Sequence, residues 1–219
     1  MDCMKSNKTT RGAGRPREFD TERALDIALD LFWEKGYEGT YLSDLTEAIG
    51  VNRPSLYAAF GNKEDLFRKV LDRYMERHEG FACHALALPT AREVVEALLY
   101  GFADMQTLPR HPRGSLTVRG GLACGVEADP IRKELAARRS ESEHVLRDRL
   151  ERAKDEGDLP PEASSADLAR YVMTVVQGMA VQASGDVTRK DLHRVAETAM
   201  LIWPSPKKKV RRYSRRAFA

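Results

Sequence analysis

The chain has 219 residues, of which 42% are hydrophobic, so it is not a wholly disordered protein, and no stretch approaches the roughly 18 apolar residues of a membrane-spanning helix. Its net charge of +3 is uneven: residues 206–219 hold seven Lys and Arg and no acid, so residues 1–205 carry 29 basic and 33 acidic residues, a net charge of −4. This balance excludes a generally basic protein, and any contact with nucleic acid must depend on local geometry.

Composition and cysteine usage indicate a helical protein of a reducing compartment. Cys3, Cys83 and Cys124 are an odd number of cysteines at wide spacing, which argues against a disulfide framework and for the cytoplasm. No apolar segment follows the basic N-terminal residues, as it would in a secretory signal. Aromatic residues are few while Ala, Leu, Glu and Arg abound, so we expect an all-α fold.

Residues 1–17 are polar and basic, and two interpretations remain open for them. They form either a disordered tail or a basic arm that touches the phosphates or the minor groove of DNA. Arg15 and Arg17 lie nearest the first predicted helix and are the candidates for DNA contacts in the second case.

The first helix is predicted to begin after Asp20. The Asp20 side chain is a good N-cap, and Glu22 in the first turn suits the helix dipole. Gly36 is expected to end the helix. Apolar residues at helical spacing form its predicted buried stripe, namely Leu25, Ala28, Leu29 and Phe32.

Residues 40–62 contain two short helical patterns with a tight break between them. In the first, Leu42, Leu45 and Ile49 fall at helical spacing, and Ser43 is placed to cap the N-terminus. Gly50 follows where a left-handed C-cap favours glycine.

The second pattern begins at Asn52, a good N-cap, and tolerates Pro54 because the first turn has an unpaired N–H. Leu56 and Phe60 face inward, and the outer face is left to Arg53, Ser55, Tyr57 and Ala58. Two such helices joined by a tight turn are typical of a helix-turn-helix, whose second helix enters the DNA major groove.

The segments FDTERALDIALDLFWEKGYEGT and GVNRPSLYAAFGNKEDLF resemble the first helix and the recognition helix of the TetR family of transcriptional regulators. The resemblance is close over roughly residues 15–75, and the helical remainder is similar to the family's ligand domain. It implies an all-α protein of about nine helices, with a three-helix DNA-binding head and a C-terminal ligand-binding and dimerisation domain. The implied division is a basic arm (1–17), the head (18–64), the second domain (65–204) and a basic tail (205–219).

Several residues are candidates for contacts with DNA. Arg53 is the best base reader, since a guanidinium can pair with guanine O6 and N7 in two parallel hydrogen bonds. The resemblance implies that Tyr57 and Lys63 meet the DNA backbone, although an exposed Tyr can also pack on the rim of the head and a Lys can be a solvated surface charge. The hydroxyl of Thr40 is either a cap or a phosphate ligand. The full set is Arg15, Arg17, Thr40, Asn52, Arg53, Pro54, Ser55, Tyr57 and Lys63.

Beyond the head, apolar spacing predicts helices over residues 63–81, 94–105, 130–156 and 166–182, and a last one through 192–203. The glycine-rich residues 113–130 lack a G-x-x-x-x-G-K-[ST] motif, so we expect a short pocket-lining helix there and no phosphate loop.

A pocket for a small effector is expected among the helices after the head. Its candidates are apolar or ambivalent residues near the expected cavity, which argues for an apolar or aromatic ligand, although such residues are more often plain core. Cys124 is a candidate redox sensor or a buried, inert thiol. The set is Phe81, His84, Phe102, Met105, Gln106, Cys124 and Met173.

The last two predicted helices carry strong apolar stripes, and they pack either against a second copy of the chain or only within their own chain. A homodimer is favoured because one recognition helix reads too few base pairs for useful specificity. The candidate interface residues are Tyr171, Val175, Gly178, Met179, Val195, Ala199 and Trp203.

These observations predict a cytoplasmic, dimeric repressor that binds a double-stranded DNA operator and is released by a small molecule. No enzyme motif, metal-ligand set or cofactor fingerprint is present in the sequence, so no catalytic residue, metal or cofactor is predicted. The alternatives are a ligand-binding or cysteine redox-sensing protein without specific DNA binding, and an engineered nuclear regulator suggested only by the basic tail.

Overall fold

The computed structural model describes residues 20–109, 111–122 and 128–204, and within these ranges the protein is all-α, as predicted. The arm that includes Arg15 and Arg17, the basic tail and Cys124 lie outside the described residues. The helices are α1 (Thr21–Gly39), α2 (Leu42–Ile49), α3 (Arg53–Phe60), α4 (Lys63–Leu86), α5 (Ala91–Met105), α6 (Leu116–Leu122), α7 (Asp129–Asp155), α8 (Ser165–Ala183) and α9 (Arg189–Leu201).

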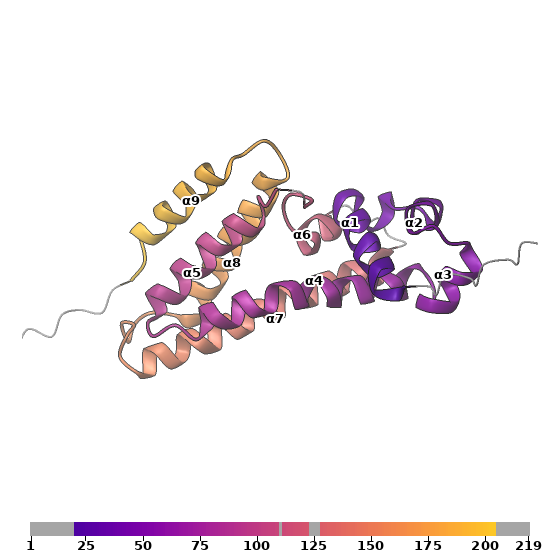
Figure 1. Cartoon of the computed structure of the whole chain (residues 1–219). Helices are drawn as coiled ribbons and strands as arrows, with labels where there is room; N and C mark the ends of the chain where they lie inside the picture. Colours follow the sequence, from indigo (N-terminus) through magenta and orange to yellow (C-terminus); the bar gives the residue numbers. More distant parts are fainter. Residues whose placement is uncertain (1–19, 110, 123–127, 205–219) are drawn as a thin grey trace, which may run out of the picture.

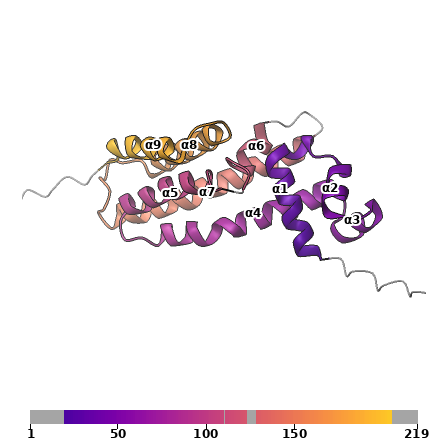
Figure 2. The same cartoon turned by 45° about the horizontal axis from the view of Figure 1, so that its top comes forward.

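The molecule is elongated, with a head of α1, α2 and α3 at one end and α5, α8 and α9 at the other (Figure 1). The long helices α4 and α7 run between the two ends. Turned by 45°, the molecule shows α8 and α9 together along one side of the body, away from α4 (Figure 2).

Local capping chemistry sets the first helices of the head. The Asp20 carboxylate accepts a hydrogen bond of 3.0 Å from the backbone N–H of Arg23, which confirms the predicted start of α1. Gly36 adopts φ 75°, a left-handed conformation that breaks the regular helix where the sequence predicted an end.

The turn of the helix-turn-helix also follows the sequence, with one correction. Gly50 has φ 78° and ψ 34°, and the Asn52 side chain accepts a hydrogen bond of 2.9 Å from the N–H of Ser55. The predicted Ser43 cap was wrong: Ser43 lies inside α2, and the Asp44 carboxylate accepts a hydrogen bond of 3.1 Å from the N–H of Tyr41, the residue that precedes the helix. Asp44 can do this because it lies in the first turn and reaches back to the chain.

Two hydrophobic cores hold together the helices of the described residues. The head core is built on α1, α2 and α3 and also takes in the buried face of α4 from Leu66 to Tyr74, together with Leu116, Ile131 and Leu135 from α6 and α7. The body core lies among α5, α7, α8 and α9. Helix α4 was predicted to end near Phe81 but continues to Leu86, because no glycine or proline interrupts residues 81–86.

Buried polar contacts anchor the far end of α4. Arg149 of α7 is 7% exposed and donates hydrogen bonds to the carbonyls of Leu86, Leu88 and Pro89, at 3.0, 2.8 and 3.1 Å. These carbonyls belong to the last residue of α4 and to the connection just beyond it, where a helix has no further N–H groups to pair with them. Arg149 therefore fixes the connection between α4 and α5. Within the described part of the chain, no helix combines the length and the apolarity that crossing a bilayer requires.

Candidate functional site

Helix α3 presents an exposed polar face at the tip of the head (Figure 1). Leu56 and Phe60, at 2% and 5% exposure, anchor the helix in the head core, as the sequence predicted. The side chains between them face outward, so the structure brings together on one surface Asn52, Arg53, Pro54, Ser55 and Tyr57.

The polar groups of this face differ in what they can offer to a partner. The carboxamide oxygen of Asn52 is already used to cap α3, which leaves its N–H₂ group for an external acceptor. Arg53 at the start of the helix is fully charged and exposed, and Tyr57 is 42% exposed with its hydroxyl available as donor and acceptor. The face therefore presents mainly hydrogen-bond donors, which suit acceptor-rich surfaces.

Thr40 does not belong to the exposed face. Its side chain is 0% exposed, and its hydroxyl donates a hydrogen bond of 2.7 Å to the carbonyl of Gly36. Thr40 supplies this donor at the point where the positive φ of Gly36 interrupts the regular helix. The predicted choice between a cap and a phosphate ligand is thus resolved here as an internal, structural role.

Lys63, at the N-terminus of α4, lies over the ring of Tyr37 with 4.4 Å from Nζ to the ring centroid. Burial lowers the pKa of Lys63, while Glu38 and Asp44 act in the opposite direction. Lys63 is therefore held by an aromatic platform and is not a freely solvated charge. Tyr37 was not among the predicted site residues, because an aromatic residue near the end of α1 is expected to lie in the hydrophobic core.

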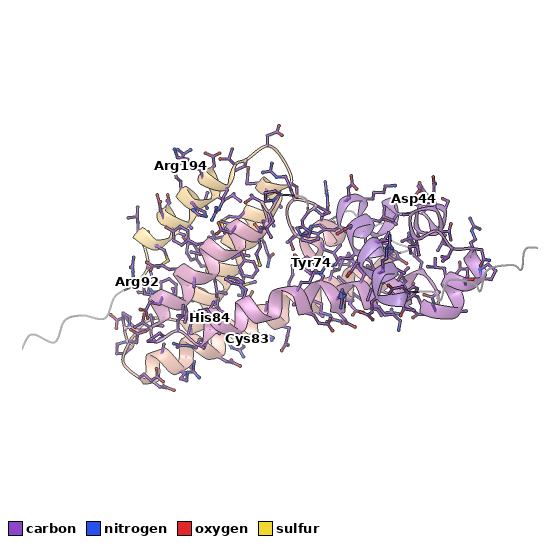
Figure 3. The ribbon with its side chains drawn as sticks, in the orientation of Figure 1. Asp44, Tyr74, Cys83, His84, Arg92 and Arg194 are labelled. Atoms are coloured by element: carbon purple, nitrogen blue, oxygen red, sulfur yellow. The ribbon has the colours of Figure 1, made fainter. Side chains whose placement is uncertain are left out.

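Tyr41, an aromatic residue that is exposed, was also missed in the sequence analysis. Tyr41 is 67% exposed, directly before α2 and beside the buried Thr40. Next to it, Asp44 pairs with Lys35 at 3.0 Å, and this hydrogen bond, with that from the N–H of Tyr41, holds the pKa of Asp44 below its ordinary value. Figure 3 shows Asp44 on α2, at the head end of the molecule. A polar aromatic residue between two helices was the available signal for Tyr41.

A cavity of about 440 Å³ lies between α4, α5, α6, α7 and α8, a size typical of sites for small organic molecules. Of the predicted pocket residues, four line it: Phe102, Met105, Gln106 and Met173. Gln106 is 4% exposed, and its side-chain N–H₂ donates a hydrogen bond of 3.3 Å to the carbonyl of Val176.

Two predicted pocket residues lie elsewhere, which corrects their assignment. The Phe81 ring packs edge-to-face on Phe102, at 5.6 Å between centroids, and fills the space that the missing Cβ of Gly101 leaves free. His84 is exposed, whereas Ala82 and Leu86 of the same helix line the cavity. Because an α-helix has 3.6 residues per turn, a residue two positions from both of them points to the opposite side of the helix. Figure 3 shows His84 and Cys83 on α4, well away from Tyr74.

The sequence missed most polar members of the cavity wall. Tyr74 is buried, and its hydroxyl donates a hydrogen bond of 3.1 Å to Ser115. Two adjacent arginines of α7, Arg138 and Arg139, also line the cavity. Their signal was weak, because α7 is so rich in charged residues that its polar face has no clear edge.

The outer faces of α8 and α9 carry part of the predicted interface. Tyr171 and Val175 are half-buried, and Gly178 and Val195 are exposed, so these four lie where another chain could reach them. Met179, Ala199 and Trp203 are only 2%, 5% and 6% exposed and pack in the body core of their own chain, which corrects their assignment to an outer face. Exposed apolar side chains that were not predicted also lie on this part of the molecule: Val181, Leu201 and Ile202.

Comparison with known proteins decides the family. The family described as "Bacterial regulatory proteins, tetR family" matches residues 24–70. The HTH-type transcriptional repressor ComR of Escherichia coli (strain K12) is 34% identical over 206 residues, which cover 92% of this chain and 95% of ComR. This chain belongs to the TetR family.

Solved structures of TetR-family proteins agree with the fold. One of them is a cysteine mutant of the regulator CifR, solved in complex with 26-bp double-strand operator DNA. It is 43% identical to this chain, the match covers 87% of this chain and 100% of the CifR chain, and the TM-score is 0.83. A TetR regulator from Rhodococcus sp. RHA1 is 42% identical over 84% of this chain, with a TM-score of 0.58. The family's model spans α1 to α3 and the start of α4, and it therefore includes the exposed face of α3.

The TetR relatives are transcriptional regulators and not enzymes, in keeping with the sequence prediction. Among the described residues, no group of three His, Cys, Asp or Glu side chains is placed to hold a metal ion. Cys83 is exposed at the rim of the cavity.

Proposed function

We propose that this TetR-family protein is a cytoplasmic repressor that binds a near-palindromic operator as a homodimer. The two α3 helices would enter successive major grooves about 34–36 Å apart, with Arg53 reading a base and Asn52, Pro54, Ser55 and Tyr57 completing the contact. Lys63, and Arg15 and Arg17 of the arm, would contact phosphates. Thr40 has no part in this contact because its hydroxyl is buried.

One observation carries this proposal: α3 is anchored by Leu56 and Phe60 and turns to the outside a face that carries the donor groups of Asn52, Arg53, Ser55 and Tyr57. Base edges and phosphates in the major groove are rich in acceptors, so the chemistry is complementary. The similarity to CifR, solved with operator DNA, and to the repressor ComR supports the same conclusion.

We further propose that a small molecule bound in the cavity between α4, α5, α6, α7 and α8 weakens the binding of the protein to its operator. Helix α4 lines the cavity through Tyr74 and Met75, and it begins at Lys63 beside the DNA-binding face. Ion pairs fix its head end: Arg73 pairs with Asp26 of α1 at 3.0 Å. A ligand that moves α4 would therefore move the head, and a coupling free energy of about 1–3 kcal/mol is sufficient for regulation.

The proposal is tested by selecting bound sequences from random duplex DNA with the purified full-length protein. A two-fold-symmetric motif is the expected result. Arg53→Ala should then weaken binding to that motif by about 1–3 kcal/mol and relax the base preference at one position in each half-site.

The matched control is Arg92→Ala, which removes the same charge from α5, at the far end from the head (Figure 3). It should leave operator affinity unchanged. Selection without any motif, or an equal effect of the two substitutions, would overturn the assignment of α3 as the reading helix. In that case the cavity would be the better place to look for the function.

A further inference from the structure

Two neighbouring arginines at the cavity wall have opposite electrostatic surroundings. Arg138 donates to the carboxylates of Asp72 and Glu134, at 2.6 and 3.2 Å. Arg139 also lines the cavity, but within the described residues its guanidinium meets no carboxylate, and its Nη1 donates to the backbone carbonyl of Thr117. The cavity thus has one cation that is neutralised and one that is not.

The charge of Arg139 is permanent, since a guanidinium keeps its proton in proteins. Burial lowers its pKa, and no acidic group of the described residues, Glu141 on the same wall included, offsets this effect. A partly desolvated cation without an anion is unfavourable, and an anionic ligand would relieve that cost. With Nη1 engaged by Thr117, the edge formed by Nε and Nη2 keeps the geometry that binds a carboxylate in two parallel hydrogen bonds.

The remainder of the cavity selects the body of the ligand. The walls from α5 and α8 contribute hydrophobic side chains, among them Leu98, Phe102, Met105 and Val176. A volume of about 440 Å³ accepts a molecule the size of a medium-chain or aromatic acid. A polar head at Arg139 and an apolar body along α5 and α8 together describe an amphipathic molecule.

We propose that the ligand of this cavity is an amphipathic organic acid whose carboxylate pairs with Arg139 while its hydrocarbon or aromatic body fills the space between α4, α5 and α8. This inference rests on the proposed function, in which the cavity receives an effector. It adds the chemical class: an anion with one acidic group at the end of an apolar body.

The test compares octanoate, octanol and octylamine, which share one apolar chain and differ in the charge of the head group. Binding to the full-length protein is measured by calorimetry at pH 7, without DNA. We expect octanoate to bind at least tenfold more tightly than octanol, and octylamine to bind most weakly, because a hydrogen-bonded charge pair is worth a tenfold or larger change in affinity.

Arg139→Gln should remove the preference of octanoate over octanol, because it removes the charge while keeping a side-chain donor that can serve either head group. The control is Arg147→Gln, on the same helix but paired with Asp148 outside this cavity, and it should keep the preference. Equal affinity for octanoate and octanol, a preference that survives Arg139→Gln, or no binding of any of the three would overturn the proposal.

A separate measurement distinguishes this inference from the proposed function. Operator DNA obtained by selection is titrated with the protein in the presence and absence of octanoate. Octanoate that binds through Arg139 but leaves operator affinity unchanged would support the acid site and refute its role as an effector site. Release of the DNA by octanoate and not by octanol would support both.

Discussion

The ring of Trp33 on α1 packs edge-to-face on that of Tyr74 on α4, with 4.9 Å between the ring centroids and an interplanar angle of 89°. Tyr74 also forms part of the cavity wall, where its hydroxyl contacts Ser115. One side chain therefore touches the head core on one side and the cavity on the other. Any ligand that displaces Tyr74 must also disturb its contact with Trp33.

Tyr74 should make the stability of the protein depend on alkaline pH. Burial raises its pKa to about 12, above the roughly 10 of an unfolded tyrosine. The stabilisation that neutral Tyr74 gives to the folded state is complete below pH 10 and is lost as the pH rises towards 12. Between these pH values Tyr74 ionises in the unfolded chain but stays neutral in the folded protein. Between these pH values, the free energy of unfolding should fall by about 2–3 kcal/mol more in the native protein than in Tyr74→Phe.

Urea denaturation at a series of pH values measures this difference. Tyr57→Phe, at an exposed position of α3, is the control and should follow the native protein. At neutral pH, Tyr74→Phe should cost only about 0.5–1.5 kcal/mol for the lost hydrogen bond to Ser115. Parallel alkaline limbs for the native protein and Tyr74→Phe would show that Tyr74 does not carry the effect.

Loss of the hydrogen bond from Thr40 to the carbonyl of Gly36 should lower the stability of the protein. Thr40→Val keeps the shape of the side chain but leaves the Gly36 carbonyl without that donor, so the free energy of unfolding should fall by about 1–3 kcal/mol. Thr40→Ser should lose less. If Thr40→Val instead left stability unchanged and weakened DNA binding, the hydroxyl would have its role at the phosphate backbone.

We expect the buried guanidinium of Arg149 to stabilise the connection between α4 and α5. Arg149→Met removes the donors to the carbonyls of Leu86, Leu88 and Pro89, and it should destabilise the protein by about 2–4 kcal/mol. Hydrogen exchange in residues 85–90 should accelerate as well. Arg147→Met, at a more exposed position of the same helix, should have little effect on either measurement, and an equal loss in both variants would contradict this role.

The exposed apolar side chains of α8 and α9 predict a surface that associates with a second copy. Val195 is 41% exposed, and Val195→Glu would place a charge in the middle of the proposed interface. Sedimentation analysis should show a dimer for the native protein and a monomer for Val195→Glu, with helical content unchanged by circular dichroism. The control, Ala136→Glu on the exposed surface of α7, should remain dimeric. A native monomer would overturn the proposed homodimer.

The sequence predicted features that depend on a few adjacent residues. The cap at Asp20, the left-handed Gly50 and the cap at Asn52 each follow from the chemistry of one short segment. The exposed and buried sides of α3 likewise follow from helical periodicity. These elements are local, so the rest of the chain does not change them.

Features that depend on distant residues were predicted less well. Phe81 was assigned to the pocket because it is apolar, but the missing side chain of Gly101, on another helix, decides where its ring lies. Met179 and Trp203 belong to apolar stripes that look alike in a core and in an interface between chains. The unpaired charge of Arg139 could not be predicted from the sequence of α7, because only tertiary packing decides whether a carboxylate lies beside a given guanidinium.

The composition of the head core limits how this regulator can be recombined with others. Leu116, Ile131 and Leu135 come from α6 and α7, yet they complete the core around Phe67. A chimaera that joins α1, α2 and α3 to the remaining helices of another TetR-family protein would leave that core partly exposed or overpacked. This would hold even if the two sequences matched well at the point where they are joined. A successful exchange of DNA specificity should therefore replace the exposed residues of α3 alone, or carry α4 and the contacting turns of α6 and α7 with the head.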